Sequence, residues 1–221
     1  MPVSQARLDD RRRRLVATAQ SLLRERYDAG FSMGELARRA GVSPATPYNL
    51  VGNKAEILRL VVEEEYRRFA AKLPKERPLG ALRALLDAID VLVAHYDDDR
   101  NFCRTAYRVI RSSDLPDVTE TVLQSGGTVL RGFVRAAVDA GELSATVAVE
   151  TFADILMRAI NSVTLAWLAG NWPRARLERE MSLSVRLVMA SVARPDLRPS
   201  LSAEIAACHE ALGSRFQTPP P

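Results

Sequence analysis

Residues 31–58 have the sequence FSMGELARRAGVSPATPYNLVGNKAEIL, in which capping residues alternate with short apolar runs. Ser32 is followed three residues later by Glu35, the capping-box pattern that starts a helix. Gly41 is expected to make the turn that follows this helix. These signals together predict a short helix over residues 33–40.

A second short helix is predicted directly after the turn AGVS at residues 40–43. Ser43 is a suitable cap, and Pro44 costs nothing in a first helical turn because its N–H would be unpaired there anyway. We therefore expect a helix over residues 44–50 and another starting near Lys54. Two short helices around such a turn form a helix-turn-helix, whose second helix enters the major groove of DNA.

The second helix carries small and polar side chains, as a groove-reading helix must. Asn49 can pair with an adenine edge, and Ala45 is small enough for close approach to a thymine methyl. Hydroxyl groups and lysine suit phosphate oxygens, which position a protein without specifying sequence. The residues predicted to bind DNA are Ser32, Ser43, Pro44, Ala45, Thr46, Tyr48, Asn49 and Lys54.

Residues 10–60 resemble the DNA-binding domain of the TetR (tetracycline-repressor-like) family of bacterial regulators. The matching residues are Ser32, Leu36-Ala37, Ala40-Gly41-Val42-Ser43, Thr46, Tyr48, Lys54 and Leu58. The resemblance implies an all-α fold with an N-terminal three-helix helix-turn-helix domain, followed by a larger helical ligand-binding and dimerisation domain. We place an N-terminal arm and the DNA-binding domain in residues 1–54, with the helix-turn-helix at about 32–51, and the regulatory domain in residues 55–221.

Three positions depart from the family pattern. Ala45 replaces a usual glycine, Pro47 replaces an aliphatic residue, and Leu50-Val51 replaces an aromatic pair. Pro47 removes the intrahelical bond to the Ser43 carbonyl, so we expect a distorted or 3₁₀-like first turn that still docks. The alternative is a small-molecule-binding or enzymatic helical protein whose helix-turn-helix is vestigial, with Pro47 as the lesion.

Charge is distributed unevenly along the chain. Residues 1–54 contain ten Arg or Lys and five Asp or Glu, a net charge of +5, whereas the remainder has 21 and 22. A basic front end is expected if that part meets a polyanion. Arg11–Arg14 fill one turn near the start of a helix expected over residues 10–27, where like charges oppose the helix dipole. A phosphate backbone would relieve that cost; a solvated basic turn is the alternative.

Residues 1–8, before this helix, are predicted to be a flexible arm.

The rest of the chain shows helical periodicity and no strand-like alternation. We expect helices over residues 79–95, 102–111, 114–140, 146–169, 174–193 and 202–212, with a disordered tail at 218–221. The 146–169 helix is apolar on most of its circumference, so both of its sides should be buried.

One side of the 146–169 helix can face the chain's own core and the other a partner chain. The resemblance implies that the last two long helices pair with those of a second subunit. The predicted interface residues are Phe152, Ile160, Val163, Trp167, Met181, Val185 and Val188. A homodimer would hold two recognition helices about 34 Å apart on a palindromic operator in double-stranded DNA. A wholly intramolecular core is the alternative.

A pocket for an unknown, largely apolar small-molecule effector is expected among the middle helices. Apolar walls with a few polar atoms are typical of such pockets. The predicted lining is Tyr96, Phe102, Cys103, Tyr107, Phe133, Met157 and Asn161. Each of these residues is also an ordinary core residue by type. Gly126-Gly127 within a helix predicts a kink or a close approach by a ligand or another helix.

Catalytic and metal motifs are not found in the sequence. His95 and His209 are far apart, and Cys103 and Cys208 have neither metal-ligand spacing nor a disulfide framework. We therefore predict no catalytic residues, no metal, no cofactor and no enzymatic activity. The longest uncharged run, between Arg158 and Arg174, has 15 residues and is too short to span a membrane, and no signal peptide is visible.

The predicted function is therefore that of a cytoplasmic, sequence-specific DNA-binding transcriptional regulator. We expect a dimeric repressor that is released by a small-molecule effector and has no membrane partner. Besides the vestigial alternative, a constitutive DNA-binding dimer without a ligand remains open from the sequence.

Overall fold

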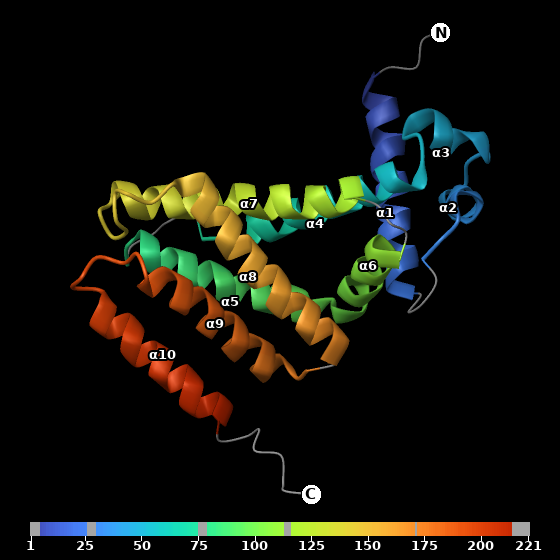
Figure 1. The fold of residues 1–221 in the computed structure, drawn as a ribbon. Coiled ribbons are helices and arrows are strands. Elements are labelled where there is room, and N and C mark those ends of the chain that lie inside the picture. Colours follow the sequence, from blue (N-terminus) through green and yellow to red (C-terminus); the bar gives the residue numbers. More distant parts are fainter. Residues whose placement is uncertain (1–4, 26–29, 75–78, 113–115, 171, 214–221) are drawn as a thin grey trace, which may run out of the picture. The chain divides into compact units, whose positions relative to one another are not determined.

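The computed structural model describes residues 5–25, 30–74, 79–112, 116–170 and 172–213, which form ten α-helices (Figure 1). They are α1 (Gln5–Glu25), α2 (Met33–Ala40), α3 (Ala45–Leu50), α4 (Lys54–Lys72), α5 (Ala81–Asp98), α6 (Arg100–Ser112), α7 (Pro116–Asp139), α8 (Val149–Gly170), α9 (Arg174–Ala190) and α10 (Arg198–Gly213). The described residues contain no strand, only an isolated antiparallel bridge between Leu143 and Ala193. The all-α prediction is confirmed.

The chain divides into two compact units. The first contains Met1–Arg68 and Asp98–Ser125, and the second contains Phe69–Asp97 and Gly126–Pro221. Helices α4, α5 and α7 therefore each contribute residues to both units. The division predicted after residue 54 separates expected functions and does not coincide with these compact units.

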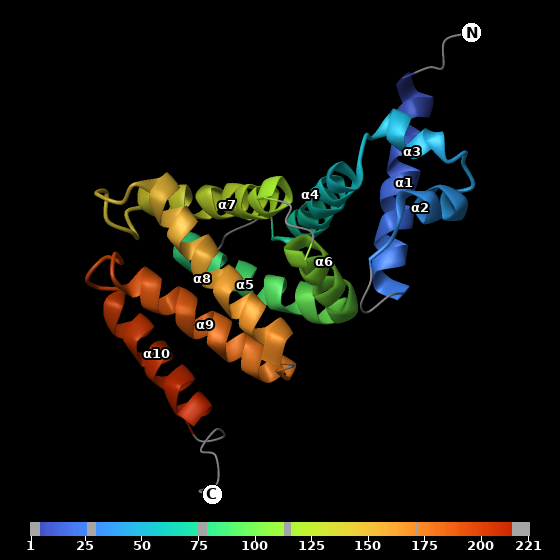
Figure 2. The same ribbon diagram turned by 45° about the vertical axis from the view of Figure 1, so that its right-hand side comes forward.

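In the first unit, α1 packs against α2, α3 and α6, and Figure 2 shows α2 and α3 beside it. One face of α1 forms an apolar stripe, because Leu15, Ala19, Leu22 and Leu23 are all buried. This stripe holds the two short helices in place, since an amphipathic helix gains most of its stability from the apolar face that it buries.

The start of α1 differs from the prediction. The helix begins at Gln5, so a flexible arm is wrong for residues 5–8, whereas residues 1–4 lie outside the described residues. The Gln5 side chain donates a hydrogen bond of 3.1 Å to the Asp9 carboxylate, one turn further along the same helix. Such i,i+4 pairs stabilise a helical turn even where it buries little surface.

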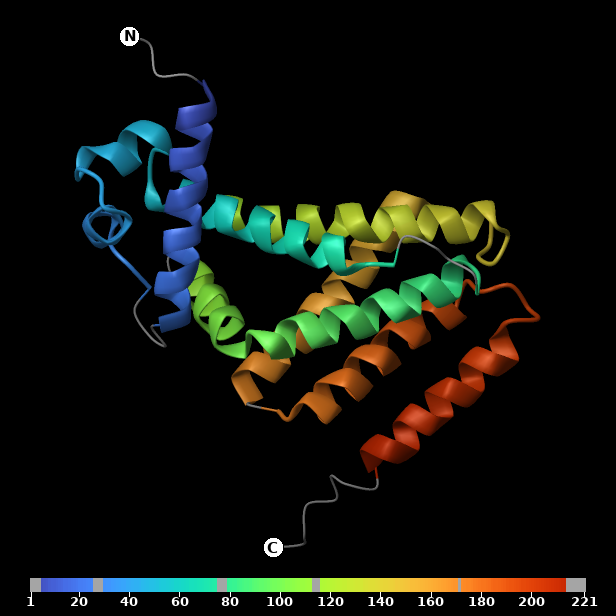
Figure 3. The same cartoon turned by 180° about the vertical axis from the view of Figure 1, so that it is seen from behind.

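In the second unit, α9 packs against both α8 and α10, and Figures 1 and 3 show α9 between them. Trp167 of α8 is fully buried at the centre of this unit. Its ring stacks on that of Tyr96 with centroids 6.2 Å apart, and its Nε1 donates to the Trp172 carbonyl at 3.1 Å. The apolar character predicted for the 146–169 segment is therefore used in the core of the chain itself.

By length and composition, α8 is the one helix of the described residues that could cross a membrane. This is weak support for a membrane span, because the core helix of a globular protein has the same length and composition. Its residues Phe152, Leu156, Ile160 and Trp167 are buried within the chain, which agrees with a core helix.

The gap predicted between the helices at residues 79–95 and 102–111 is shorter in the structure. Helix α5 continues to Asp98, and Asp99 alone separates it from α6. The Asp97 carboxylate lies 3.8 Å from the Arg174 guanidinium, and Arg24 Nε donates to Asp99 Oδ2 at 2.5 Å. Because these acids have partners, they need no solvated loop.

Three boundaries near the C-terminus also differ from those predicted. Helix α8 begins at Val149, and α9 ends at Ala190 because Ala193 is held in the bridge to Leu143. Helix α10 begins earlier than expected and has Pro199 in its first turn, where a missing N–H costs nothing. The predicted tail at 218–221 lies outside the described residues.

The paired glycines of α7, Gly126 and Gly127, are both buried. A Cβ added to Gly127 would lie 3.1 Å from Arg131 Nη1 of the same helix and 3.7 Å from an Asp154 carboxylate oxygen on α8. Because 3.7 Å is an ordinary van der Waals distance, the kink or close approach predicted at these glycines stays a prediction.

Candidate nucleic-acid interface

Helix α2 starts as the capping residues predict. Ser32 has extended backbone angles (φ −92°, ψ 156°), and its side chain accepts a hydrogen bond of 3.1 Å from the Glu35 N–H. The Ser32 carbonyl accepts the first intrahelical bond, from Leu36 N–H at 2.9 Å. With Leu36 and Ala37 buried behind it, the helix has one defined inner face.

Gly41 closes α2 with a left-handed conformation (φ 66°, ψ 39°). The Val42 N–H reaches back to the Ala37 carbonyl at 3.0 Å, and the Gly41 N–H to the Arg38 carbonyl at 3.3 Å. This is the Schellman pattern that satisfies the last carbonyls of a helix. A Cβ at Gly41 would meet no atom within 4 Å, so the backbone conformation alone requires glycine here.

Helix α3 begins with a tightened turn. Pro44 has helical angles (φ −55°, ψ −30°), and the Thr46 N–H donates to the Ser43 carbonyl, three residues back, at 3.0 Å. Such i,i+3 bonding is the 3₁₀ pattern. The Ser43 carbonyl thus accepts the Thr46 N–H in place of a bond from residue 47, which as proline has no N–H. The expected 3₁₀-like first turn is confirmed. The Ser43 hydroxyl lies 2.8 Å from the Thr46 hydroxyl, a side-chain contact in place of the predicted cap.

Pro47 is the buried residue of α3. Its carbonyl accepts the Val51 N–H at 2.9 Å, so the helix continues past it. The proline ring thus occupies the inward position at which the resembling family has an aliphatic side chain. Val51, another departure from the family pattern, is also buried, at 8% exposure.

The opposite face of α3 points outward. Tyr48 is 55% exposed, and Asn49 and Ala45 are exposed beside it. Ser32, Ser43 and Pro44 are exposed as well, whereas Thr46 is half-buried. The structure therefore places the predicted base-reading residues on one accessible helix face. Their contact with DNA remains a prediction.

Lys54 is half-buried at the start of α4. Its ammonium lies 5.5 Å from the centre of the Phe31 ring, an arrangement that attracts a cation to the ring face. This contact holds the Lys54 charge beside Phe31, just before the start of α2.

Asn53 caps α4, which the sequence interpretation missed. Its Oδ1 accepts the Glu56 N–H at 3.0 Å. The signal was present, since Asn53 and Glu56 have capping-box spacing.

The Glu56 carboxyl lies among arginines. A hydrogen bond of 2.9 Å from Arg59, and then the charges of Arg59 and Arg12, lower the pKa of this carboxyl, while its burial raises the pKa.

The basic turn of α1 is fully at the surface, since Arg11–Arg14 are all exposed. Arg13 lies 3.5 Å from Asp10, and Arg12 lies 4.0 Å from Glu56. Pairs as exposed and as long as these contribute only about 0–1 kcal/mol, so a phosphate can replace the carboxylate at little cost.

A polar cluster is buried where α1 meets α4. Gln20, at 1% exposure, donates from Nε2 to Glu65 at 2.7 Å and accepts from Arg68 at 3.2 Å. Arg24 lies 3.4 Å from the same Glu65 carboxylate and also bonds Asp99. Burial raises the pKa of Glu65, while the charges of Arg68 and Arg24 lower it. Nothing in the sequence pairs these residues, which only the fold brings together.

The residues predicted to line an effector pocket are split between the units. Tyr96, Phe133, Met157 and Asn161 belong to the second unit, and Phe102, Cys103 and Tyr107 to the first. The pKa of the Cys103 thiol is raised above its usual range, mainly by burial, so it stays protonated at neutral pH. A cavity of about 390 Å³ in the first unit is lined by none of the seven. The effector pocket therefore remains a prediction.

Most of the predicted dimer residues are buried within the single chain. The buried ones are Phe152, Ile160, Trp167, Met181 and Val185, whereas Val163 and Val188 are half-buried. A side chain that is already buried has no accessible surface that a partner chain could cover. These five residues are therefore part of the core of the single chain. The exposed large apolar residues of this helix pair are Ile155 (42%) and Leu187 (49%).

The described residues contain no group of three or more His, Cys, Asp or Glu side chains that could hold a metal ion. They present the short helices α2 and α3, with one exposed face of α3, and a basic turn of α1 in the same unit. That arrangement can contact a polyanion.

Several solved structures share this fold. The TetR-family repressor QsdR of R. erythropolis is 24% identical, with 84% of this chain and 97% of that chain covered and a TM-score of 0.59. TylP, a TetR regulator from Streptomyces fradiae, is 21% identical over 92% and 97%, with a TM-score of 0.62. SmeT, the repressor of the Stenotrophomonas maltophilia multidrug efflux pump SmeDEF, is 18% identical over 83% and 91%, with a TM-score of 0.64.

No protein-family model and no curated protein matches the chain by sequence. At these identities the structural likeness shows the fold, and the predicted resemblance to TetR-family regulators is confirmed at that level.

Proposed function

We propose that this chain, which has the fold of the TetR-family regulators, is a sequence-specific DNA-binding transcriptional regulator. The observation that carries the proposal is the exposed face of α3, with Ala45, Tyr48 and Asn49, on a helix whose start and preceding turn are held by backbone hydrogen bonds. A helix presented in this way fits the major groove.

Within this proposal the two kinds of contact come from different residues. Asn49 donates to and accepts from an adenine edge, and Ala45 allows the helix to approach the groove floor. The hydroxyl groups and the lysine hold phosphate oxygens and set the register, and these residues are Ser32, Ser43, Thr46, Tyr48 and Lys54. The exposed arginines of α1 add attraction that depends on salt.

A homodimer would allow the exposed faces of two α3 helices to bind one palindromic operator. Two copies related by a twofold axis present two α3 helices to the half-sites of a palindromic operator, about 34 Å apart. The outer faces of α8 and α9, with exposed Ile155 and Leu187 and half-buried Val163 and Val188, supply apolar surface for the pairing.

Repression released by a small, largely apolar effector completes the proposal. The effector must bind one conformer of the dimer more tightly than the other, because only differential affinity shifts an equilibrium. Helix α4 is continuous from Lys54 to Lys72 and so links residues of both compact units covalently. QsdR and SmeT, which share the fold, are described as repressors.

The vestigial alternative depended on Pro47 as a lesion in α3. The burial of Pro47 and the hydrogen bond from the Val51 N–H to its carbonyl favour an intact helix over this alternative, and the Pro47→Leu comparison tests it. A constitutive DNA-binding dimer differs only in having no effector, and release assays distinguish it.

The direct test is a mobility-shift assay with the DNA upstream of the chain's own gene. A specific complex is expected at moderate salt, with an affinity that falls steeply as salt rises, because phosphate contacts release counterions. A duplex of the same composition in shuffled order is the control. Equal affinity for both duplexes would overturn the proposal.

A further inference from the structure

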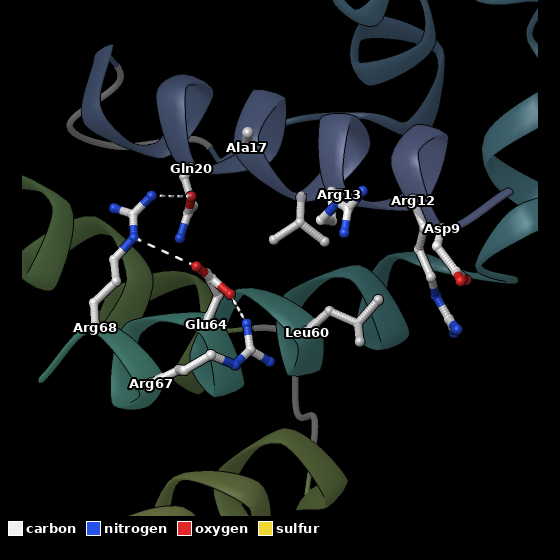
Figure 4. A pocket seen from close by; sticks show the side chains of 10 residues that line it. Asp9, Arg12, Arg13, Ala17, Gln20, Leu60, Glu64, Arg67 and Arg68 are labelled. Atoms are coloured by element: carbon white, nitrogen blue, oxygen red, sulfur yellow. Dashed lines mark hydrogen bonds and ion pairs between the residues drawn. The ribbon is translucent and has the colours of Figure 1, made fainter. Parts of the chain in front are cut away.

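A groove of about 390 Å³ runs between α1 and α4 in the first unit (Figure 4). Its α1 side is formed by Asp9, Arg12, Arg13, Val16, Ala17 and Gln20, and its α4 side by Leu60, Glu64, Arg67 and Arg68. The volume lies within the range of about 300–1,000 Å³ that small-molecule sites occupy. None of these residues belongs to the predicted base-reading face of α3.

The charges of the groove are unbalanced. Four arginines line it against two carboxylates, those of Asp9 and Glu64. At one end, Arg67 and Arg68 both turn towards Glu64, and Arg68 Nε lies 3.6 Å from it, as Figure 4 shows. That end is already supplied with carboxylate.

At the other end Asp9 lies beside Arg12 (Figure 4), and the two arginines pair with carboxylates outside the groove. Arg12 meets Glu56 only at 4.0 Å, and Arg13, 76% exposed, meets Asp10 at 3.5 Å. Exposed pairs of this kind are worth about 0–1 kcal/mol, so they yield readily to a better anion. Guanidinium groups bind carboxylate and phosphate through paired N–H donors, which makes them suited to such a ligand.

The floor between the two charged ends is apolar. Val16, at 9% exposure, and Ala17 come from α1, and Leu60 comes from α4. Figure 4 places Leu60 between the cluster of Glu64 with Arg67 and the side chains of Arg12 and Asp9. A simple inorganic anion would leave this floor in water, whereas an aliphatic or aromatic body would cover it.

We propose that the α1–α4 groove binds a small amphipathic organic anion. Its carboxylate or phosphate group pairs with Arg13 and Arg12, and its apolar body lies over Val16, Ala17 and Leu60. This site is separate from the effector pocket expected among the middle helices. It does not depend on the DNA-binding proposal, because the test below contains no operator.

The test is isothermal titration calorimetry of the full chain with decanoate and with decyl phosphate, below their micellar concentrations. One molecule of each is expected to bind per chain. Decanol and inorganic phosphate are the matched ligands, since each keeps one half of the chemistry. If either of them binds as tightly as decanoate, the proposed combination of an anionic head and an apolar body is overturned.

Arg13→Gln and Arg14→Gln are matched variants, because both arginines are exposed on the same turn of α1 and only Arg13 lines the groove. Arg13→Gln should weaken decanoate binding at least about tenfold, the loss of one charge-assisted hydrogen bond. Arg14→Gln should change the affinity for decanoate by less than about twofold, because salt screens the attraction between the ligand and an exposed charge outside the groove. Equal losses in the two variants would show a diffuse surface effect and overturn the site.

Ala17→Phe fills the groove and leaves every charge in place. Ala17 is exposed, so the chain should fold, and circular dichroism with a thermal melt checks this. Decanoate binding is expected to be abolished, and unchanged binding would overturn the proposal. Random-sequence DNA is a second ligand for the two variants. If Arg13→Gln weakens the binding of DNA but not of decanoate, and Arg14→Gln weakens neither, the groove binds a polyanion and the proposal fails.

Discussion

The α2–α3 pair and the α8–α9 pair were both predicted to meet a partner, yet the structure treats their predicted contact residues in opposite ways. On α3, Tyr48, Asn49 and Ala45 are exposed. On α8 and α9, Trp167 and Met181 are fully buried within the chain. Helix α3 has six residues and buries only Pro47, so its other face stays outward. A long helix that is apolar on most of its circumference buries several faces against its neighbours, so its apolar content does not show which face meets a partner.

The largest effect should come from emptying the centre of the second unit. Trp167→Ala removes a fully buried ring and its hydrogen bond to Trp172, so a loss of about 3–5 kcal/mol is expected in the free energy of unfolding, as for buried aromatics generally. Urea unfolding followed by circular dichroism measures it. If Trp167→Ala instead leaves unfolding unchanged and weakens self-association, Trp167 lies at a subunit interface after all.

Leu187→Ala is the matched change on the exposed side, at 49% exposure. It should change the unfolding free energy of a dilute, monomeric sample by less than about 0.5 kcal/mol. Its effect should appear in sedimentation equilibrium as a weaker dimer. A Leu187→Ala variant that associates as the parent does would remove this face from the proposed pairing.

On the DNA-binding side, Asn49→Ala should cost about 1–3 kcal/mol of affinity for the operator, the value of one good base contact. Affinity for shuffled DNA should be unchanged, because phosphate contacts are retained. Paired mobility-shift titrations on the two duplexes measure the difference. Equal losses on both would mean that Asn49 touches the backbone and not a base.

Gly41→Val tests whether the turn sets the outer face. With φ at 66° and no atom within 4 Å of an added Cβ, the strain is that of the backbone alone, about 1–2 kcal/mol. Differential scanning calorimetry reports it. Gly34→Ala is the matched glycine change within α2 and should stabilise by about 0.5–1 kcal/mol, because its backbone is helical. A stabilising Gly41→Val would contradict the left-handed turn.

Asn53→Ala should destabilise by about 1 kcal/mol, since it removes the cap of α4. Ser43→Ala should lower the free energy of unfolding by only a few tenths of that amount, because the Ser43 hydroxyl contacts the Thr46 hydroxyl and caps no backbone N–H. Denaturant midpoints compare the pair. A larger loss at Ser43 would show that it, and not Asn53, has the capping role.

The smallest effect is expected from Pro47→Leu. The Ser43 carbonyl already accepts the Thr46 N–H, so a new N–H at position 47 gains little. DNA affinity should stay within about threefold, which corresponds to less than one hydrogen bond. A specific complex that forms only with Pro47→Leu would restore the vestigial interpretation.

Much of the helical layout could be predicted from the sequence, because capping signals are local. Ser32 with Glu35, Gly41 at the turn, and Pro44 with Pro47 set where α2 ends and how α3 begins, through bonds that span five residues or fewer. Asn53 carries the same kind of local signal, because its side chain caps α4 through the Glu56 N–H three residues later. The DNA-contact assignments built on these helices remain predictions.

The tertiary structure alone decided which faces are covered. The burial of Gln20 with Glu65 joins residues 45 positions apart, and the groove beside it needs two helices that no local pattern pairs. The same holds for Trp167, whose apolar character was evident while its neighbours were not. Hydrogen bonds within a turn depend on a few adjacent residues, whereas burial depends on every helix that packs nearby, and so it is known only once the chain has folded.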